Sequence, residues 1–153
     1  MATWIFDGRE LCDDDLAGAY GFIYLITHLP TGKKYLGRKY LTKAATKQVK
    51  GVKKKIRKES DWRDYYSSSP ELLEMLAQEG PEVFSREVLV LCKTRGETNY
   101  MEVLLQYLFG VLHDPNYINS NISSKYFKKN VLKYVKLPVS LRSLLPTQHP
   151  AFH

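Results

Sequence analysis

The sequence predicts an α+β domain in which a small three-stranded antiparallel sheet is flanked by helices. Residues 21–27 and 33–38 are rich in aromatic and β-branched side chains and enclose a segment with proline and glycine, which is typical of two strands joined by a turn. Residues 84–91 first alternate and then become fully apolar, as a central strand does. Residues 70–79 and 94–112 carry apolar side chains at helical spacing, so the predicted order is β-β-α-β-α.

The segments around the first two strands give weaker signals. Residues 1–18 are acidic and are expected to form a loosely structured lead-in, with Trp4, Ile5 and Phe6 able to pack on the domain. Residues 39–58 are basic and lack clean helical spacing. We expect them to lie on the surface as part helix and part loop.

Positive charge is concentrated in one stretch of the chain. The net charge is +7, and the stretch from Lys33 to Arg63 holds thirteen Lys and Arg residues against two acids, Glu59 and Asp61. Such a block is suited to binding a phosphate backbone, because each neutralised phosphate releases counterions. The alternative is a solvated lysine-rich loop without a partner.

Residues 60–69 contain three aromatic side chains in a short polar segment. Ser60 is a suitable N-cap for one helical turn that presents Trp62, Tyr65 and Tyr66 on neighbouring faces. These rings can either line a DNA groove or pack into the domain.

The two main helices have recognisable limits. Ser69 and Pro70 begin the first, and Gly80 with Pro81 ends it. Residues 123–153 form a basic C-terminal extension, with a lysine-rich helix over 123–136 and an extended, proline-containing tail. The apolar stripe predicted on the longer helix consists of Tyr100, Val103, Leu104, Tyr107, Leu108 and Val111.

Composition limits the class of protein. The chain of 153 residues is 44% hydrophobic, which suits one compact domain with a real core. No apolar run is long enough to span a bilayer, and the N-terminus lacks the features of a secretory signal. Cys12 and Cys92 are far apart without metal-ligand spacing, so two buried free thiols in the cytoplasm are expected rather than a disulfide.

Two tripeptides on the predicted hairpin carry a family resemblance. Phe22-Ile23-Tyr24 followed by Tyr35-Leu36-Gly37 resembles the signature of the GIY-YIG nucleases, with Phe22 in place of glycine and Leu36 in place of isoleucine. Residues 60–69 are similar to the SDW-x-x-YYGSS stretch of phage-type members, with Ser67 in place of glycine. The resemblance implies a nuclease domain over residues 19–122 that acts on double-stranded DNA.

The resemblance also implies a catalytic centre. Glu102 matches the single metal-binding glutamate on the helix after the third strand, and Glu97 is its competitor. Magnesium, or manganese in its place, is the implied cofactor, since it prefers oxygen ligands and binds few carboxylates at once. Tyr24 is expected to help deprotonate the attacking water, and Tyr35 to orient it or hold a phosphate oxygen. The four histidines form no ligand set, which disfavours a zinc or histidine-based nuclease.

The remaining site residues are basic or amide side chains. Arg38 directly follows the signature glycine and can donate two hydrogen bonds to a phosphate. Many family members carry this arginine where the chain has Ala45, whereas phage-type members have a basic pair here, with Lys39, Lys43 and Arg57 as further candidates. Asn119 matches the asparagine that braces the site, with Asn121 as its alternative. The predicted DNA contacts are Lys33, Lys34, Lys39, Lys43, Lys53, Lys54, Lys55, Arg57, Trp62 and Arg63.

These observations predict a magnesium-dependent DNA endonuclease, of the free-standing homing type that phages encode. It is expected to work in the cytoplasm, which for a phage protein is that of the host, and no membrane partner is expected. The alternatives are a catalytically silent nucleic-acid-binding module on the same fold, or a restriction or repair nuclease. The target sequence, the oligomeric state and the choice between nicking and double-strand cutting have no signal in the sequence.

Overall fold

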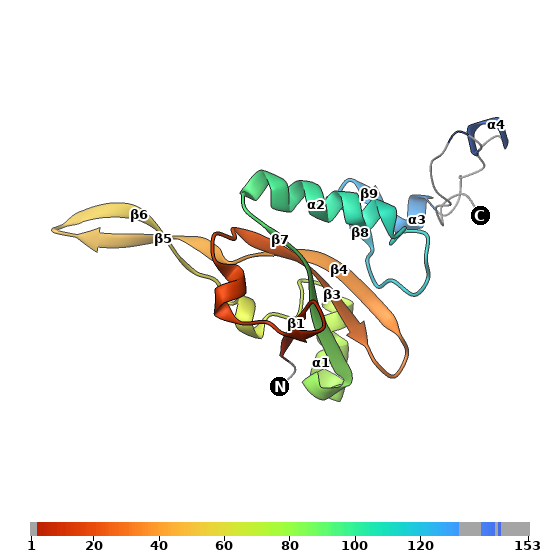
Figure 1. The fold of residues 1–153 in the computed structure, drawn as a ribbon, viewed down its shortest axis with the longest axis horizontal. Coiled ribbons are helices and arrows are strands. Elements are labelled where there is room, and N and C mark those ends of the chain that lie inside the picture. The colour runs from red at the N-terminus through yellow and green to blue at the C-terminus, as the bar shows by residue number, and fades with distance from the viewer. Residues whose placement is uncertain (1–2, 132–138, 143, 145–153) are drawn as a thin grey trace.

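The computed structural model describes residues 3–131, 139–142 and 144, and it confirms the mixed α+β class (Figure 1). Its main sheet has five strands in the spatial order β2-β1-β7-β3-β4. The three predicted strands are β3, β4 and β7, and they pair in antiparallel fashion as predicted. The prediction is wrong in the number of strands, because β1 and β2 extend the sheet and β1 runs parallel to β7. The five strands are β1 (Trp4–Phe6), β2 (Arg9–Glu10), β3 (Gly21–His28), β4 (Lys33–Tyr40) and β7 (Phe84–Cys92).

The two additional strands lie in residues 3–18, so the prediction of a loosely structured lead-in is wrong. Asp7 and Gly8 have positive φ angles of 50° and 78°, and this two-residue turn pairs β1 with β2. Trp4 is buried, and its indole N–H donates to the Trp62 carbonyl oxygen at 2.9 Å. Pairing with the distant strand β7 therefore orders a segment whose own sequence gives little signal.

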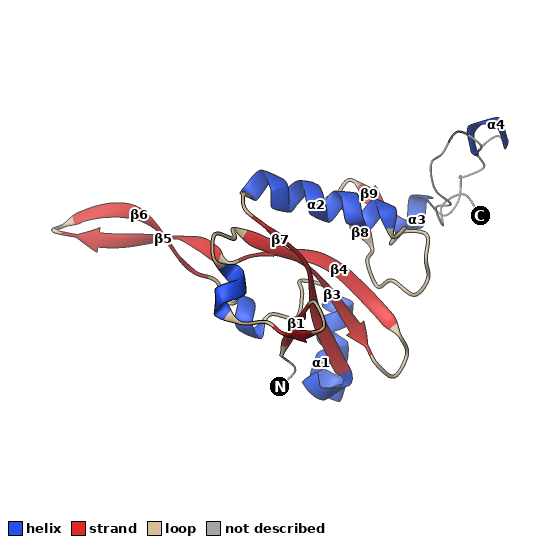
Figure 2. Cartoon of the chain, viewed as in Figure 1, coloured by secondary structure: helices blue, strands red, loops and turns tan. Residues whose placement is uncertain are grey.

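Alternation along β3 sends its side chains to two separate cores. Phe22 and Tyr24 belong to the core that α1 (Pro70–Glu79) helps to form. Ile23 belongs to the core on which α2 (Arg95–Leu108) packs. Figure 2 shows the two helices on opposite sides of the sheet.

Helix α1 has the predicted limits. Ser69 Oγ accepts a hydrogen bond from the Leu72 N–H at 3.3 Å, and Gly80 ends the helix with a φ of 83°. Three short 3-10 helices accompany the main elements: η1 (Asp13–Leu16), η2 (Trp62–Asp64) and η3 (Pro81–Val83).

Helix α2 is shorter than predicted, and the face that packs on the sheet differs from the predicted apolar stripe. It ends at Leu108, and Gly110 follows with a φ of 63°. Leu108 is exposed, as are Tyr100 and Tyr107, although Val103 packs on the sheet. The side that faces the sheet carries several polar residues, which hydrophobic periodicity does not detect: Thr98 and Gln106 are buried, and Glu102 is nearly so.

The basic segment after β4 is a β-hairpin, so the prediction of part helix and part loop is wrong. Strands β5 (Thr42–Val49) and β6 (Val52–Glu59) pair in antiparallel fashion over their whole length and project from the rest of the molecule (Figure 1). Lys50 and Gly51 have φ angles of 50° and 78°, which is the geometry of a type I′ turn. The Lys-Gly pair was the turn signal available in the sequence.

Residues 60–69 do not form the predicted helical turn with Ser60 as its cap. Ser60 Oγ donates to the Tyr40 carbonyl oxygen at 2.6 Å, and η2 begins only at Trp62. The Trp62 ring is buried in the core around Phe22, so it cannot contact DNA and that prediction is wrong. Ser67, at the position where relatives have glycine, has a φ of 98°.

The C-terminal part also differs from the prediction. Strands β8 (Asn121–Ile122) and β9 (Tyr126–Phe127) form a small hairpin, and α3 (Lys128–Val131) follows. The helix predicted over 123–136 therefore begins only at 128, and residues 132–136 lie outside the described residues. Residues 139–142 form a short helix, α4 (Val139–Arg142), where an extended chain was predicted.

Two expectations about composition can be compared with the structure. No helix among the described residues is long and apolar enough to cross a membrane. Cys12 and Cys92 are free thiols, but only Cys92 is buried, so the expected burial of Cys12 is wrong. Cys12 lies in the N-terminal segment, where its thiol donates to Asp15 Oδ2 at 3.2 Å.

Candidate active site

The predicted catalytic residues gather at β4, an edge strand of the main sheet. In the pairing of β3 with β4, Tyr24 lies directly opposite Gly37, and Tyr35 lies two residues before Gly37. Because side chains alternate along a strand, both tyrosines lie on the α1 face of the sheet, whereas Arg38 lies on the α2 face. Among the described residues, the outer side of β4 forms one backbone bridge, between Lys34 and Tyr117, and beyond it groups from both faces can meet around Gly37 and Arg38.

Gly37 lets the two tyrosine rings approach the edge strand. A Cβ atom at this position would lie 2.5 Å from Tyr24 Oη and 2.8 Å from Tyr24 Cζ. It would also lie 3.0 Å from Tyr35 Cε1. The space of the missing side chain is thus filled by the Tyr24 hydroxyl end, which explains why the signature requires glycine here.

The two tyrosine rings are stacked, and a third tyrosine closes the cluster. The centroids of Tyr24 and Tyr35 are 6.2 Å apart with an interplanar angle of 27°, and Tyr65 meets Tyr24 edge-on at 5.8 Å. Burial, followed by the neighbouring Tyr65 and Tyr35, raises the pKa of Tyr24 well above its ordinary value. Burial is also the main cause that raises the pKa of Tyr35. Both hydroxyls are therefore protonated at neutral pH.

An ion pair between strand and helix faces this cluster from the other side. Arg38 Nη1 donates to Glu102 Oε1 at 2.5 Å, across 64 residues of sequence. The Glu102 side chain is only 12% exposed. Arg38 Nε also donates to the hydroxyl of Tyr40, which in turn donates to Asn99 Oδ1. Burial disfavours the charged form of Arg38, but the Glu102 carboxylate and the Tyr40 hydroxyl together outweigh this effect, so the pKa of the guanidinium is raised.

Asn119 holds the edge strand in place immediately before Gly37. Its Oδ1 accepts from the Leu36 N–H at 3.0 Å, and its Nδ2 donates to the Leu36 carbonyl oxygen at 2.8 Å. Gln106 Nε2 donates to the same carbonyl oxygen at 3.1 Å. Asn119 is buried and both ends of its amide are occupied, so it positions the backbone between Tyr35 and Gly37.

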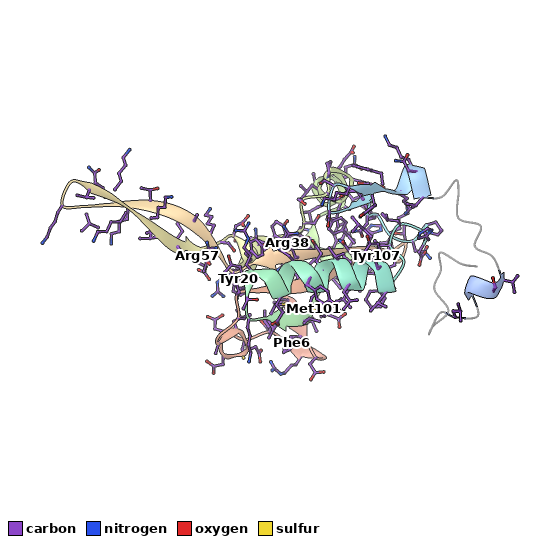
Figure 3. All side chains as sticks on the ribbon, turned by 90° about the horizontal axis from the view of Figure 1, so that it is seen from above. Phe6, Tyr20, Arg38, Arg57, Met101 and Tyr107 are labelled. Atoms are coloured by element: carbon purple, nitrogen blue, oxygen red, sulfur yellow. The ribbon has the colours of Figure 1, made fainter. Side chains whose placement is uncertain are left out.

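These groups line a hollow on the edge of the sheet. One pocket of about 330 Å³ is lined by both tyrosines, Arg38, Glu102 and the basic residues Lys39 and Lys43. A second pocket of about 260 Å³ shares Tyr35, Arg38 and Glu102 with it and reaches Asn119. Figure 3 shows Arg38 close to the α2 helix that carries Met101. Four predicted catalytic residues are thus brought together in one pocket, and Asn119 lies in the adjoining one.

The competing and additional candidates are distributed differently. Glu97 lies in the first turn of α2, where its carboxylate accepts from the Lys93 N–H at 3.4 Å, and it does not line either pocket. Lys39 Nζ lies 3.8 Å from the centroid of the Tyr65 ring and 2.6 Å from Asp61 Oδ1. Ala45 lies on β5, beyond the pocket.

Several residues of the hollow were not predicted as site residues. Tyr40, Tyr65 and Ser68 line the first pocket, and Gln106 lines the second. The sequence offers a signal for two of them. Tyr40 lies two residues after Arg38 on the same strand, and Gln106 lies four residues after Glu102 on the same helix, so each shares a face with a predicted site residue. Tyr65 and Ser68 come from a loop whose path depends on the tertiary fold.

The predicted DNA contacts fall into three groups. Arg57 and Arg63 are bound within the molecule: Arg57 donates to Thr42, and Arg63 pairs with Asp13 and Glu59. Lys39 is largely buried in the pocket wall. The exposed lysines among the predicted contacts are Lys33, Lys43, Lys53, Lys54 and Lys55, and Lys34 is half-buried.

The oxygen atoms of the hollow can be compared with what a divalent cation needs. Among the described residues, no group of three or more His, Cys, Asp or Glu side chains could hold a metal ion. Glu102 presents one carboxylate, and Gln106, one turn further along α2, has a buried Oε1 without a hydrogen-bond partner among these residues. A magnesium ion that keeps most of its water and shares a substrate phosphate fits this set, whereas a cage made of protein ligands does not.

A sheet edge with two paired tyrosines and an arginine, facing a glutamate on a helix, is typical of a nuclease domain of the GIY-YIG class. The chain matches the family model SegE_GIY-YIG, described as "Putative endonuclease segE, GIY-YIG domain", over residues 4–131. It belongs to this phage-type family and is a nuclease that acts on phosphodiester bonds. The comparison with curated proteins finds no match. The comparison with solved structures also finds none.

Proposed function

We propose that the protein is a metal-dependent endonuclease that hydrolyses phosphodiester bonds of double-stranded DNA, with Mg²⁺ or Mn²⁺ as its cofactor. The observation that supports this proposal is the hollow in which Tyr24, Tyr35, Arg38 and Glu102 converge on the edge of the sheet. The narrower proposal, a free-standing homing endonuclease of phage type, rests on the matched family and on the similarity of residues 60–69 to phage-type members.

The tyrosines position the attacking water. The pKa of each phenol is raised, so in the resting site the hydroxyls are neutral and act by hydrogen bonding. Tyr24 becomes a base only when a cation beside it stabilises the phenolate. Tyr35 is the less buried of the two and is suited to hold a phosphate oxygen or the water. Their shared face on β3 and β4 fixes the distance between the two hydroxyls.

Arg38 and Glu102 exchange partners when DNA binds. In the free protein, each charge neutralises the other within the hollow. A phosphate offers the guanidinium a second anion with matching bidentate geometry, which frees the carboxylate for a cation. The ion pair therefore keeps a partly buried carboxylate stable until substrate arrives, because removing one partner of such a pair is costly.

Glu102 is the residue that would hold the metal, with substrate phosphate and water as the other ligands. A divalent cation there supplies charge neutralisation at the phosphate and lowers the pKa of a bound water. Asn119 does not serve as a ligand in this proposal. It holds β4 at Leu36, so the tyrosine and arginine on either side of Gly37 keep their positions.

The proposal is tested by incubating supercoiled plasmid with purified protein and Mg²⁺, Mn²⁺ or EDTA. Phage DNA serves as a second substrate, in case the target site is rare. The variant is Glu102→Gln, which keeps the size of the side chain, and Glu97→Gln on the same helix is the matched control. We expect metal-dependent nicking or linearisation by the wild type and the control, and a loss of at least about 100-fold in Glu102→Gln.

Three results would speak against the proposal in different ways. Equal cutting by Glu102→Gln and wild type would exclude Glu102 as the metal ligand. Cutting in EDTA would exclude metal dependence. No cutting of either DNA, combined with salt-sensitive binding, would favour a silent nucleic-acid-binding module.

A further inference from the structure

The hairpin formed by β5 and β6, here called the basic arm (residues 42–59), packs little against the rest of the described structure. Its strands contact each other extensively, and Figure 2 shows them extending away from the sheet and both main helices. An isolated two-stranded hairpin is only marginally stable in water. The arm therefore has little packing of its own to explain why it is held in this form.

The two faces of the arm differ in chemistry. In the antiparallel register, side chains directly opposite each other share a face. One face, here the lysine–aliphatic face, alternates lysine pairs with aliphatic pairs: Lys43 with Lys58, Ala45 with Ile56, Lys47 with Lys54, and Val49 with Val52. The other face, here the polar face, pairs a neutral residue with a charged one each time: Thr42 with Glu59, Ala44 with Arg57, Thr46 with Lys55, and Gln48 with Lys53.

The lysine–aliphatic face is unfavourable in water on two counts. Like charges directly opposite each other on a hairpin repel and destabilise it, and this face has two such pairs. Ile56, which lies between these pairs, is 39% exposed, and Val52, which lies beyond them at the tip, is 59% exposed. The polar face has no pair of like charges. A partner that supplies negative charge and apolar surface together would relieve both costs on the first face.

We propose that the lysine–aliphatic face of the basic arm docks in the major groove of duplex DNA, beside the scissile phosphate. The inference rests on the proposed function and adds how the substrate is held. The major groove is about 12 Å wide and admits a two-stranded β-ribbon. Each lysine pair reaches the phosphates on the two sides of the groove, while the aliphatic pairs lie toward the base edges. Aliphatic side chains make few sequence-specific contacts, so the arm binds DNA of many sequences.

The root of the arm fixes its direction relative to the catalytic pocket. Thr42 and Lys43, at the start of β5, line the pocket itself. Arg57 Nε donates to Thr42 Oγ1 at 2.8 Å, and its Nη2 donates to the Thr42 carbonyl oxygen at 2.9 Å. The Arg57 guanidinium also lies 5.3 Å from the centroid of the Tyr20 ring. Figure 3 labels both residues at the root of the arm. Arg57 is therefore an anchor of the arm.

The length of the arm sets the extent of the contact. Each strand has eight residues, which at about 3.3 Å per residue gives a reach of about 26 Å. A rise of about 3.4 Å per base pair converts this reach into about eight base pairs. The arm should contact the duplex over this distance on one side of the cut.

The test measures binding of full-length protein to a fluorescent duplex of about 30 base pairs by anisotropy, in EDTA and over a range of salt concentrations. The variant Lys47→Gln/Lys54→Gln removes two charges from the lysine–aliphatic face. The matched control, Lys53→Gln/Lys55→Gln, removes two charges from the polar face of the same hairpin. Under this proposal these two predicted DNA contacts face away from the duplex. Thermal unfolding checks the fold, and the first variant should be at least as stable as the wild type because it removes a repulsive pair.

We expect the salt slope of the first variant to fall by about 1.8, since each phosphate contact contributes about 0.9, and affinity at low salt to fall by at least about tenfold. The control should lose less than about 0.5 of the slope. Ile56→Thr should weaken binding without changing the slope, because it removes apolar contact and no charge. Equal losses in the two double variants, or no loss in either, would refute the assignment of the face.

The outcome is separable from that of the proposed function. If no metal-dependent cutting is found but binding still depends on the lysine–aliphatic face, the arm assignment stands and the nuclease proposal fails. If the wild type cuts and both double variants bind alike, the arm assignment fails alone. Equal competition by single-stranded DNA would overturn docking in a duplex groove.

Discussion

Replacing Gly37 with alanine introduces a methyl group into space that the Tyr24 hydroxyl already occupies. The added Cβ would lie 2.5 Å from Tyr24 Oη and 2.8 Å from Tyr24 Cζ, closer than non-bonded contact permits. Neither the backbone of β4 nor the Tyr24 ring can move freely, because Asn119 holds the strand at Leu36 and the ring is buried. Relief of the clash therefore has to displace the Tyr24 hydroxyl or the strand against these restraints, at a cost in stability and in the geometry of the site.

The size of the effect follows from this crowding. Inserting one carbon into a packed site costs about 1–3 kcal/mol. For a chain of this length that corresponds to a Tm lower by about 2–12 °C. A displacement of about 1 Å in a catalytic group can reduce the rate by about 100-fold, so we expect Gly37→Ala to lose plasmid cutting by about that factor. Thermal unfolding and the plasmid assay with Mg²⁺ measure the two effects separately.

Gly96→Ala is the matched control, because a Cβ at Gly96 meets no atom within 4 Å. Gly96 lies in the first turn of α2, and alanine there should leave Tm unchanged or raise it. Adding Tyr24→Phe to Gly37→Ala removes the closest clashing atom, so part of the lost Tm should return while cutting does not. If Gly37→Ala cuts plasmid as well as the wild type and unfolds at the same Tm, the Tyr24 hydroxyl does not occupy the space of the missing side chain.

Two further predictions concern the strand and the buried phenols. Asn119→Ala leaves the buried Leu36 N–H without its partner and should lower the free energy of unfolding by about 1–3 kcal/mol. The control Asn121→Ala should cost far less, and equal costs would contradict the bracing role of Asn119. Because the pKa of Tyr24 is raised in the folded protein, the unfolded chain loses this proton first, and stability should fall as pH rises above about 10. Tyr24→Phe should weaken this pH dependence, measured by chemical unfolding at several pH values. The control Tyr100→Phe, which changes an exposed ring, should leave it unchanged. The same slope of unfolding free energy against pH in both variants would refute the prediction.

The signature residues show how much of the candidate site could be predicted from the sequence. Tyr24, Tyr35 and Arg38 lie on two strands joined by a short turn, so local spacing is sufficient to place them near one another. Glu102 was assigned by its position on a helix, and the structure brings it to Arg38 across 64 residues. The buried stripe of α2 was predicted on the wrong side because Glu102 and Gln106, which face the sheet, are polar.

The sequence alone determined the elements that local chemistry specifies. Helix α1 is defined by its Ser69 cap and by Gly80, and β7 by an apolar run. The tertiary structure decided the features that depend on distant partners. Strand β1 is ordered by pairing with β7, and Trp62 is buried beneath β3 rather than open to DNA. The basic arm depends on both kinds of information. Its Lys50-Gly51 turn is specified locally, whereas contacts at its root set its direction from the catalytic pocket. Local propensities act within a few residues, and only the folded chain brings residues such as Leu36 and Asn119 into contact across 83 positions.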